Sequence, residues 1–144
     1  MAQRLFLVTV KTGSGCCAVA LLLTLVMLSG CSGDDSAQVL QAANVAVLVG
    51  APADGGDDAA VTGTVTIIDG CLGIDNDVAV WPAGTTVVEA EGPVIDVPDL
   101  GSVRVGDRVE GAGGYLSARD LTGEQSPPLP TTCGDASIVV YRPE

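Results

Sequence analysis

Apolar and polar residues are distributed in two different ways along this 144-residue chain. Ala18 to Leu28 is an uncharged and almost wholly apolar run, AVALLLTLVML, and a polar, acidic segment begins a few residues later. The run is too short to span a membrane, because about 20 helical residues are needed to cross the hydrocarbon core. Arg4 and Lys11 precede it. Positive charges followed by a short apolar run are typical of an export signal.

From Val61 onward the pattern has the period of β-strands. Val61, Gly63, Val65 and Ile67 alternate with threonines, which predicts a half-buried strand. The other stretches of strand length are Cys71 to Ile74, Val78 to Trp81, Thr85 to Ala90, Val94 to Val97, Val103 to Val105, Val109 to Leu116 and Ser137 to Tyr141. No stretch has a clear helical period. The sequence therefore predicts an all-β domain, a small barrel or sandwich of six or seven strands.

The sequence between the apolar run and Val61 does not predict a single type of secondary structure. Asn44 to Val49 fits a strand, whereas Ala37 to Ala46 is rich in helix formers. Ala51 to Asp58 is rich in Gly, Pro and Asp, which is typical of a loop or linker. We therefore expect a flexible tether over residues 31–60 and a folded domain over residues 61–144.

Four residues that end the apolar run, Leu28-Ser29-Gly30-Cys31, resemble the lipobox of bacterial lipoprotein precursors. The resemblance implies that residues 1–30 are a lipoprotein signal peptide, cut between Gly30 and Cys31. It also implies that Cys31 carries the lipid, since a thiolate is the nucleophile that accepts a diacylglyceryl group. Acyl chains such as palmitate would then hold the protein at a membrane. The alternatives are an ordinary secretory cleavage site with an incidental Cys and an uncleaved membrane anchor.

Ser32 follows Cys31 where many lipoproteins that stay at the inner membrane have Asp. By the same resemblance, Ser32 permits sorting to the outer membrane in a bacterium with two membranes. In a bacterium with one membrane, the anchor would be the outer face of the cell membrane. Both cases place the domain on the extracytoplasmic side.

Charge limits the possible partners. The chain has 18 acidic and 6 basic side chains, and every acidic residue but only four basic ones lie from Cys31 onward, which leaves a side-chain charge of −14 there. A nucleic-acid surface needs clustered Lys and Arg to neutralise phosphates, so we expect no nucleic-acid partner. Adsorption to anionic lipid head groups is disfavoured for the same reason. Contact with the membrane is expected only through the lipid on Cys31.

Two cysteines remain in the domain, Cys71 and Cys133. Exported proteins meet an oxidising compartment, so an even count of thiols predicts one structural disulfide. Closing a loop of roughly sixty residues stabilises a fold by about 4 kcal/mol on the chain-entropy model. A redox pair or a metal site is the alternative, but the sequence has no CxxC motif and no His.

A cluster of oxygen-bearing side chains follows the first predicted strand. Asp69, Asp75, Asn76 and Asp77 are residue types that bind Ca²⁺. Their spacing is not that of an EF-hand loop, and Asp and Asn are also the favoured residues of tight hairpin turns. We expect these residues to form turns and expect no metal site, with Ca²⁺ binding as the alternative.

Aromatic residues are few. Trp81, Tyr115 and Tyr141 together would make a face for a glycan or peptide, but a single Trp in so small a core is more typical of central packing.

Basic side chains are also few. The arginines of the domain are Arg104, Arg108, Arg119 and Arg142. Ion pairing of Arg104 and Arg108 with the neighbouring Asp107 and Glu110 is the expected arrangement, with anion binding as the alternative.

Two segments, GTVTIIDG at residues 63–70 and VRVGDRVEG at residues 103–111, resemble the small OB-like barrels of some exported bacterial proteins. The resemblance covers about Val61 to Val140. It implies that the all-β domain is an OB-like barrel, and it implies no activity.

Catalysis is not expected, and no cofactor is implied. After Lys11 the chain has neither Lys nor His for acid–base work, and no nucleophile motif is present. We expect a lipid-anchored, extracytoplasmic, non-catalytic β-domain that contacts an envelope protein or glycan. The alternatives are an envelope glycan hydrolase with an Asp/Glu pair and a calcium-dependent adhesion module.

Overall fold

The structure is a computed structural model that describes residues 36–53, 59–89, 92–123 and 125–144. The chain divides into two units, Met1–Gly30 and Cys31–Glu144, and every described residue belongs to the second. Gly30 and Cys31 of the predicted lipidation site lie outside the described residues. In the part described, no helix has the length and apolar character needed to cross a membrane.

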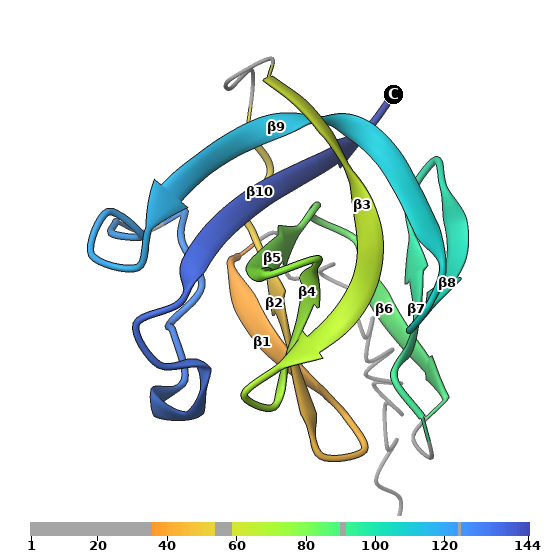
Figure 1. Ribbon diagram of the computed structural model, residues 1–144, viewed down its shortest axis with the longest axis horizontal. Helices are drawn as coiled ribbons and strands as arrows, with labels where there is room; N and C mark the ends of the chain where they lie inside the picture. The colour runs from red at the N-terminus through yellow and green to blue at the C-terminus, as the bar shows by residue number, and fades with distance from the viewer. Residues whose placement is uncertain (1–35, 54–58, 90–91, 124) are drawn as a thin grey trace, which may run out of the picture. The chain divides into compact units, whose positions relative to one another are not determined.

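Ten β-strands and one short 3₁₀ turn make up the described part of the chain (Figure 1). The strands are β1 (Gln38–Ala42), β2 (Val45–Val49), β3 (Ala59–Ile68), β4 (Cys71–Ile74), β5 (Asp77–Trp81), β6 (Thr86–Glu89), β7 (Val94–Val97), β8 (Gly101–Arg104), β9 (Arg108–Ser117) and β10 (Ser137–Pro143). The turn η1 (Thr131–Cys133) precedes β10. The predicted all-β class is confirmed, and each strand expected after Val61 is present with small shifts at its ends.

The strands form one seven-stranded and one three-stranded sheet. The larger sheet has the order β1-β2-β4-β3-β9-β10-β5, and β5 also pairs with β2 and β4. The smaller sheet is the meander β6-β7-β8. In Figure 1, β9 and β10 are long neighbouring strands that curve strongly, and the small sheet lies to one side of them.

Three strands of the larger sheet run in the same direction. β5 pairs in parallel with β2 through Leu48–Val80 and Val49–Trp81, and in parallel with β10 at residues 78–80 and 138–140. The carboxyl ends of β2, β5 and β10 therefore meet at one edge of the sheet. This edge is where the candidate site is found.

The first hairpin corrects the sequence-based boundary. The expected tether over residues 31–60 contains β1 and β2, and all five residues of β2 are buried. β2 has apolar neighbours on both faces of the sheet, so its residues, VAVLV, form a continuous apolar run instead of alternating. Such a short apolar run does not separate strand from helix by period, which explains why the sequence left this stretch undecided.

One face of the larger sheet encloses the main core together with the small sheet. We call this set the inner core: its buried members are Ala42, Val45, Val47, Val49, Val61, Val65, Leu72, Ile74, Ala79, Trp81, Ile95, Val97, Val103, Val109, Val139 and Tyr141. Ile95, Val97 and Val103 come from β7 and β8, so the small sheet covers the same core as the larger one. The alternation of strand side chains places every second residue of β2, β5 and β10 in this core.

The opposite face of the same strands carries a second apolar set, which we call the outer cluster. Its buried members are Ala46, Leu48, Cys71, Val78, Val80, Cys133 and Ile138. Leu121, Leu129 and Ala136 from the segment between β9 and β10 pack against it. The disulfide between Cys71 and Cys133, with Cα atoms 5.6 Å apart, ties this segment to the start of β4. The predicted disulfide is thus formed, and it holds a loop over the sheet.

Glycines allow β9 to lie close to β10. A Cβ atom on Gly113 would be 1.8 Å from the carbonyl oxygen of Val140, and one on Gly111 would be 2.2 Å from that of Arg142. No side chain fits at either position without moving the backbone of β10. Glycines within a strand also allow it to bend sharply, in agreement with the strong curvature of β9 in Figure 1.

Candidate functional site

A pocket with a volume of about 490 Å³ opens at the edge where β2, β5 and β10 end. The residues that line it come from the ends of these strands, from β9 and from the turn between β7 and β8: Gly50, Ala51, Pro52, Ala53, Val80, Trp81, Pro82, Ala83, Pro98, Asp99, Gly113, Gly114, Leu116, Val140, Tyr141, Arg142 and Pro143. The parallel pairing between β5 and β10 stops at Val80 and Val140. The pocket therefore lies where two paired strands diverge.

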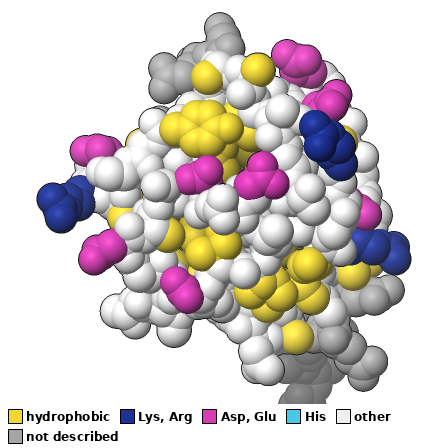
Figure 2. Space-filling model, in the orientation of Figure 1, with side chains coloured by type: hydrophobic (Ala, Val, Ile, Leu, Met, Phe, Trp, Pro, Cys, Tyr) yellow, Lys and Arg dark blue, Asp and Glu magenta, His cyan; other side chains and the backbone are white. Residues whose placement is uncertain are grey.

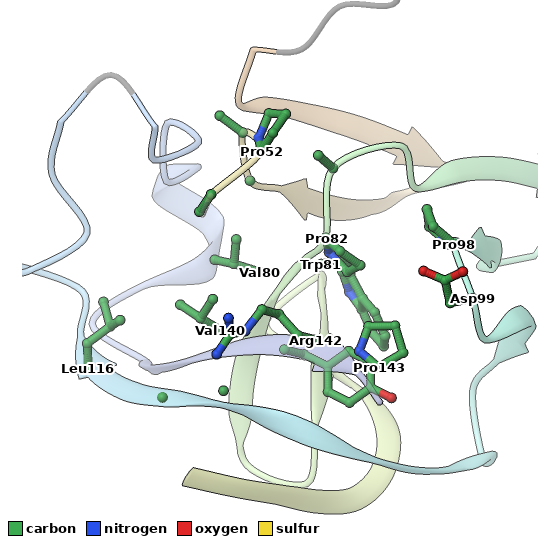
Figure 3. Close-up of a pocket in the computed structure, with 17 residues that line it drawn as sticks. Pro52, Val80, Trp81, Pro82, Pro98, Asp99, Leu116, Val140, Arg142 and Pro143 are labelled. Atoms are coloured by element: carbon green, nitrogen blue, oxygen red, sulfur yellow. The ribbon is translucent and has the colours of Figure 1, made fainter. Parts of the chain in front are cut away.

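Proline rings form much of the wall. Pro52, Pro82, Pro98 and Pro143 come from four separate segments and surround Trp81 in Figure 3. Each proline fixes its own backbone φ angle, which restricts one dihedral in each of these segments. The turn after Pro82 is further held by Thr85, whose hydroxyl donates to the Pro82 carbonyl oxygen at 2.8 Å. The pocket is built from rigid parts.

Two buried aromatic rings lie behind the pocket wall. Trp81 and Tyr141 are both fully buried, and their ring centroids are 5.5 Å apart in an edge-to-face arrangement. The Tyr141 hydroxyl donates to the Glu110 carbonyl oxygen at 2.9 Å, and burial raises the pKa of this hydroxyl. The Trp81 indole nitrogen is buried and has no hydrogen-bond partner among the described residues. The expected packing role of Trp81 is confirmed by its complete burial.

Burial also separates the three aromatic residues that the sequence singled out. Tyr115 lies on β9 with 56% of its surface exposed, while Trp81 and Tyr141 have none. A shared aromatic face for a glycan or peptide is therefore not formed.

Two charged side chains line the pocket, Arg142 and Asp99. In the view of Figure 3 they lie on opposite sides of Trp81. Arg142 already interacts with another group of the protein, so it is not without a partner. The Asp99 carboxylate, by contrast, has no hydrogen-bond or ion-pair partner in the described ranges. Asp99 has a φ of 64°, a left-handed conformation that Asp tolerates better than most residues, in the turn closed by Leu100 N–H and the Val97 carbonyl oxygen at 3.1 Å.

Of the acidic residues considered for Ca²⁺ binding, Asp69 and Asp75 lie in turns and Asp77 begins β5. Asp69 adopts a φ of 48° before Gly70, in the hairpin between β3 and β4. The Asp75 carboxylate accepts a hydrogen bond from the Thr64 backbone N–H at 2.8 Å. Among the described residues, no group of three or more His, Cys, Asp or Glu side chains is placed to hold a metal ion.

The arginines are dispersed. Arg108 lies 3.8 Å from Glu110 between Nε and Oε1, which is the pairing expected from the sequence, although both side chains are exposed. Asp107 accepts a hydrogen bond from the backbone N–H of Arg104 at 3.0 Å instead of pairing with its guanidinium. Arg119 lies beside Asp135 in a small surface hollow. Only Arg142 lines the main pocket.

Figure 2 shows the surface on one side of the domain. Acidic side chains are spread over this face among a few basic ones, and apolar patches lie between them. This spread of acidic side chains should repel anions, and the basic side chains on this face are scattered among them.

The sequence did not point to the pocket. Its lining is mostly Gly, Ala, Val and Pro, which are residue types without distinctive chemistry, and they come from positions as distant as Gly50 and Pro143. One signal was available: breaker residues follow directly after the apolar runs that end at Val49, Trp81 and Val97. Sequence alone does not show that these three breaks lie side by side.

In comparisons with known proteins, no protein family, no curated protein and no solved structure matches this chain.

Proposed function

We propose that this chain is a lipid-anchored, extracytoplasmic β-domain that binds a partner of the cell envelope and does not catalyse a reaction. The observation that supports binding is the pocket of about 490 Å³ at the ends of β2, β5 and β10. Pockets of about 300–1,000 Å³ with mostly apolar walls and a few polar groups are the usual sites for small ligands. The anchor is supported by the resemblance of Leu28-Ser29-Gly30-Cys31 to a lipobox.

The lining of the pocket favours binding over catalysis. Asp99 is its single carboxylate among the described lining residues, whereas a glycosidase needs two carboxyl groups that flank the bond to be cleaved. The chain has no His, and its last Lys is Lys11. The glycan hydrolase is therefore not favoured by this site, and the calcium-dependent adhesion module is not favoured by the turn-forming acids.

For the finer fold, we propose an OB-like barrel. The pairings of β5 with β10 on one side and with β2 and β4 on the other favour a closed arrangement of these strands. The hairpin of β1 and β2 and the small sheet β6-β7-β8 are then additions to it.

The proposed anchor would hold the domain close to the bilayer. β1 begins at Gln38, seven positions after Cys31. An extended chain spans at most ~3.6 Å per residue, so this tether reaches about 25 Å. A binding partner would therefore be met at or near the membrane surface, and the acidic domain would remain in water.

Labelling with radioactive palmitate tests the anchor. Cys31→Ser should abolish labelling and release or leave unprocessed the protein, because the thiol that accepts the lipid is gone. Cys17→Ser is the matched control, since it removes a thiol from the segment expected to be discarded, and it should label like the parent. Equal labelling of Cys31→Ser and the parent would overturn the proposed anchor.

Crosslinking in living cells, followed by recovery of the anchored protein, tests the binding role. We expect one dominant envelope component, and we expect Ala83→Trp, which fills the pocket, to reduce its recovery. A component recovered equally with the parent and the filled variant would contradict the role of the pocket. Turnover of an envelope glycan by the purified protein would contradict the non-catalytic role.

A further inference from the structure

We propose that the pocket binds a small amphipathic cation, with a compact hydrocarbon body and one ammonium group directed at Asp99. The inference rests on the proposed binding role of the pocket, and it does not depend on the lipid anchor. Three features of the described residues support it: the apolar walls, the unpartnered carboxylate and the charge of the domain.

The walls require an apolar ligand body. Val80, Leu116 and Val140 come from the same face of the sheet as the outer cluster and continue it into the pocket. The other wall residues are Gly, Ala and Pro, apart from Trp81 and Tyr141, which are fully buried, and the two charged residues. Such walls have few side-chain donors or acceptors to replace the hydrogen bonds that a polar ligand makes to water. Removing apolar surface from water is the favourable term that remains.

The rigid rim favours a compact ligand. The four prolines come from separate segments, so the shape of the pocket is largely fixed before a ligand arrives. A preformed site loses little conformational entropy on binding, which benefits a ligand that is itself rigid.

Asp99 determines the expected sign of the ligand charge. Its carboxylate lines the pocket from an exposed turn and has no protein partner among the described residues, so water solvates it and a cationic group of a ligand can reach it. The side-chain charge of −14 from Cys31 onward raises the local concentration of cations and lowers that of anions. An ammonium group is the simplest ligand group that gains from both.

Arg142 and the aromatic rings give two other ligands less support. Arg142 would attract an anion, but it already interacts with another group of the protein, and the surplus of acidic side chains opposes an anion. A sugar would stack on an exposed aromatic face, and both rings at this pocket are fully buried.

Three probes with one hydrocarbon body test the proposal: 1-adamantylamine, 1-adamantanol and 1-adamantanecarboxylate. The full chain is titrated in the presence of phosphatidylcholine vesicles, whether or not it attaches to them, and binding is followed through the fluorescence of Trp81, the only Trp in the sequence, which lines the pocket. The amine should bind most tightly, followed by the alcohol and then the carboxylate. An exposed ion pair predicts about a twofold to fivefold preference for the amine over the alcohol. This preference should shrink as salt is added.

Two variants separate the role of Asp99 from the effect of net charge. Asp99→Asn should remove the preference for the amine and leave the affinity for the alcohol unchanged. Asp96→Asn is the matched control, because it removes the same charge from an exposed position on β7 that does not line the pocket. Each probe also partitions into the vesicles. This contribution is the same for the parent and the variants, so it cancels when they are compared with one probe.

The outcomes distinguish the ligand from the site. A carboxylate that binds as tightly as the amine, or an equal loss in both Asn variants, would overturn the assignment of a cation to Asp99. Absence of binding by all three probes would overturn the pocket as a site for a small apolar ligand, whereas the proposed binding of an envelope partner stands or falls with the crosslinking experiment. Loss of palmitate labelling in Cys31→Ser, by contrast, concerns only the anchor.

Discussion

The two faces of the larger sheet are stabilised in different ways. The inner core contains both large aromatic residues, Trp81 and Tyr141, and is covered by a second sheet. The outer cluster contains no aromatic residue, and it is covered by a loop that a disulfide holds in place. Strands β2, β5 and β10 contribute side chains to both sets. Each of these strands is therefore stabilised by sheet packing on one face and by the disulfide-linked loop on the other.

The difference shows how a small, aromatic-poor domain achieves burial. A domain of this size buries a limited share of its surface, and a disulfide compensates by restricting the unfolded chain. The regular strands form the inner core, where side chains alternate. The irregular segment between β9 and β10 has no ladder of its own and depends on Cys133 to stay in place.

The largest effect is expected at the inner core. Trp81→Ala should lower the free energy of unfolding by about 3–5 kcal/mol, because it leaves a cavity between two sheets that cannot collapse easily. Val80→Ala, the neighbouring residue on the opposite face, should cost about 1–2 kcal/mol. Chemical denaturation followed by circular dichroism measures both, since Trp81→Ala removes the fluorescent residue. Equal losses of unfolding free energy in Trp81→Ala and Val80→Ala would show that the two faces of the sheet are not stabilised differently.

The disulfide should matter mainly for the outer face. Replacing Cys71 and Cys133 together by Ala should lower the free energy of unfolding by about 2–4 kcal/mol. Hydrogen exchange should show the difference in space: amides of residues 118–136 should lose most of their protection through local opening, while amides of the β3–β9 ladder should lose only the amount set by the lower free energy of global unfolding. A uniform loss along the chain would mean that the disulfide supports the whole domain.

A smaller effect is expected at Tyr141. Tyr141→Phe removes the hydrogen bond to the Glu110 carbonyl oxygen and should cost about 1 kcal/mol below pH 10. Burial raises the pKa of Tyr141 above 10.0, so above that pH the unfolded chain loses this proton first and the stability of the parent falls. Tyr141→Phe should lack this alkaline fall.

Denaturant titrations between pH 8 and pH 11 measure that fall. Tyr115→Phe is the control, because Tyr115 is 56% exposed and its removal should leave the pH profile of the parent unchanged. An alkaline fall of the same size in Tyr141→Phe would assign it to another group.

Local patterns made most of the fold predictable. Alternation with threonines predicted β3, and Asp69 was expected in a tight turn, where it lies between β3 and β4. The count of two cysteines in the domain allowed one pairing, which the structure contains. These predictions rest on neighbours in sequence or on elimination, and neither requires knowledge of long-range pairing.

Long-range pairing accounts for what the sequence did not predict. β2 was undecided because both of its faces are buried, which depends on β5, on the small sheet and on the loop over the outer cluster. The pocket depends on three strand ends that lie far apart in the chain. Its clearest polar group, Asp99, was one of 18 acidic residues and had no distinguishing neighbour in sequence.

The parallel pairing of β2 with β5, and of β5 with β10, also bears on how the chain acquires its structure during synthesis. β2 precedes β4 and β5 by about thirty residues and β10 by about ninety. In a chain that emerges with its N-terminus first, from the ribosome or across a membrane, the apolar segment VAVLV has only the adjacent β1 as a partner until β4 and β5 follow, and its other edge can pair with a neighbouring chain. Slow, non-local closure of this kind is a period of vulnerability to aggregation, so nascent chains of this protein should depend on chaperone protection until β5 has emerged.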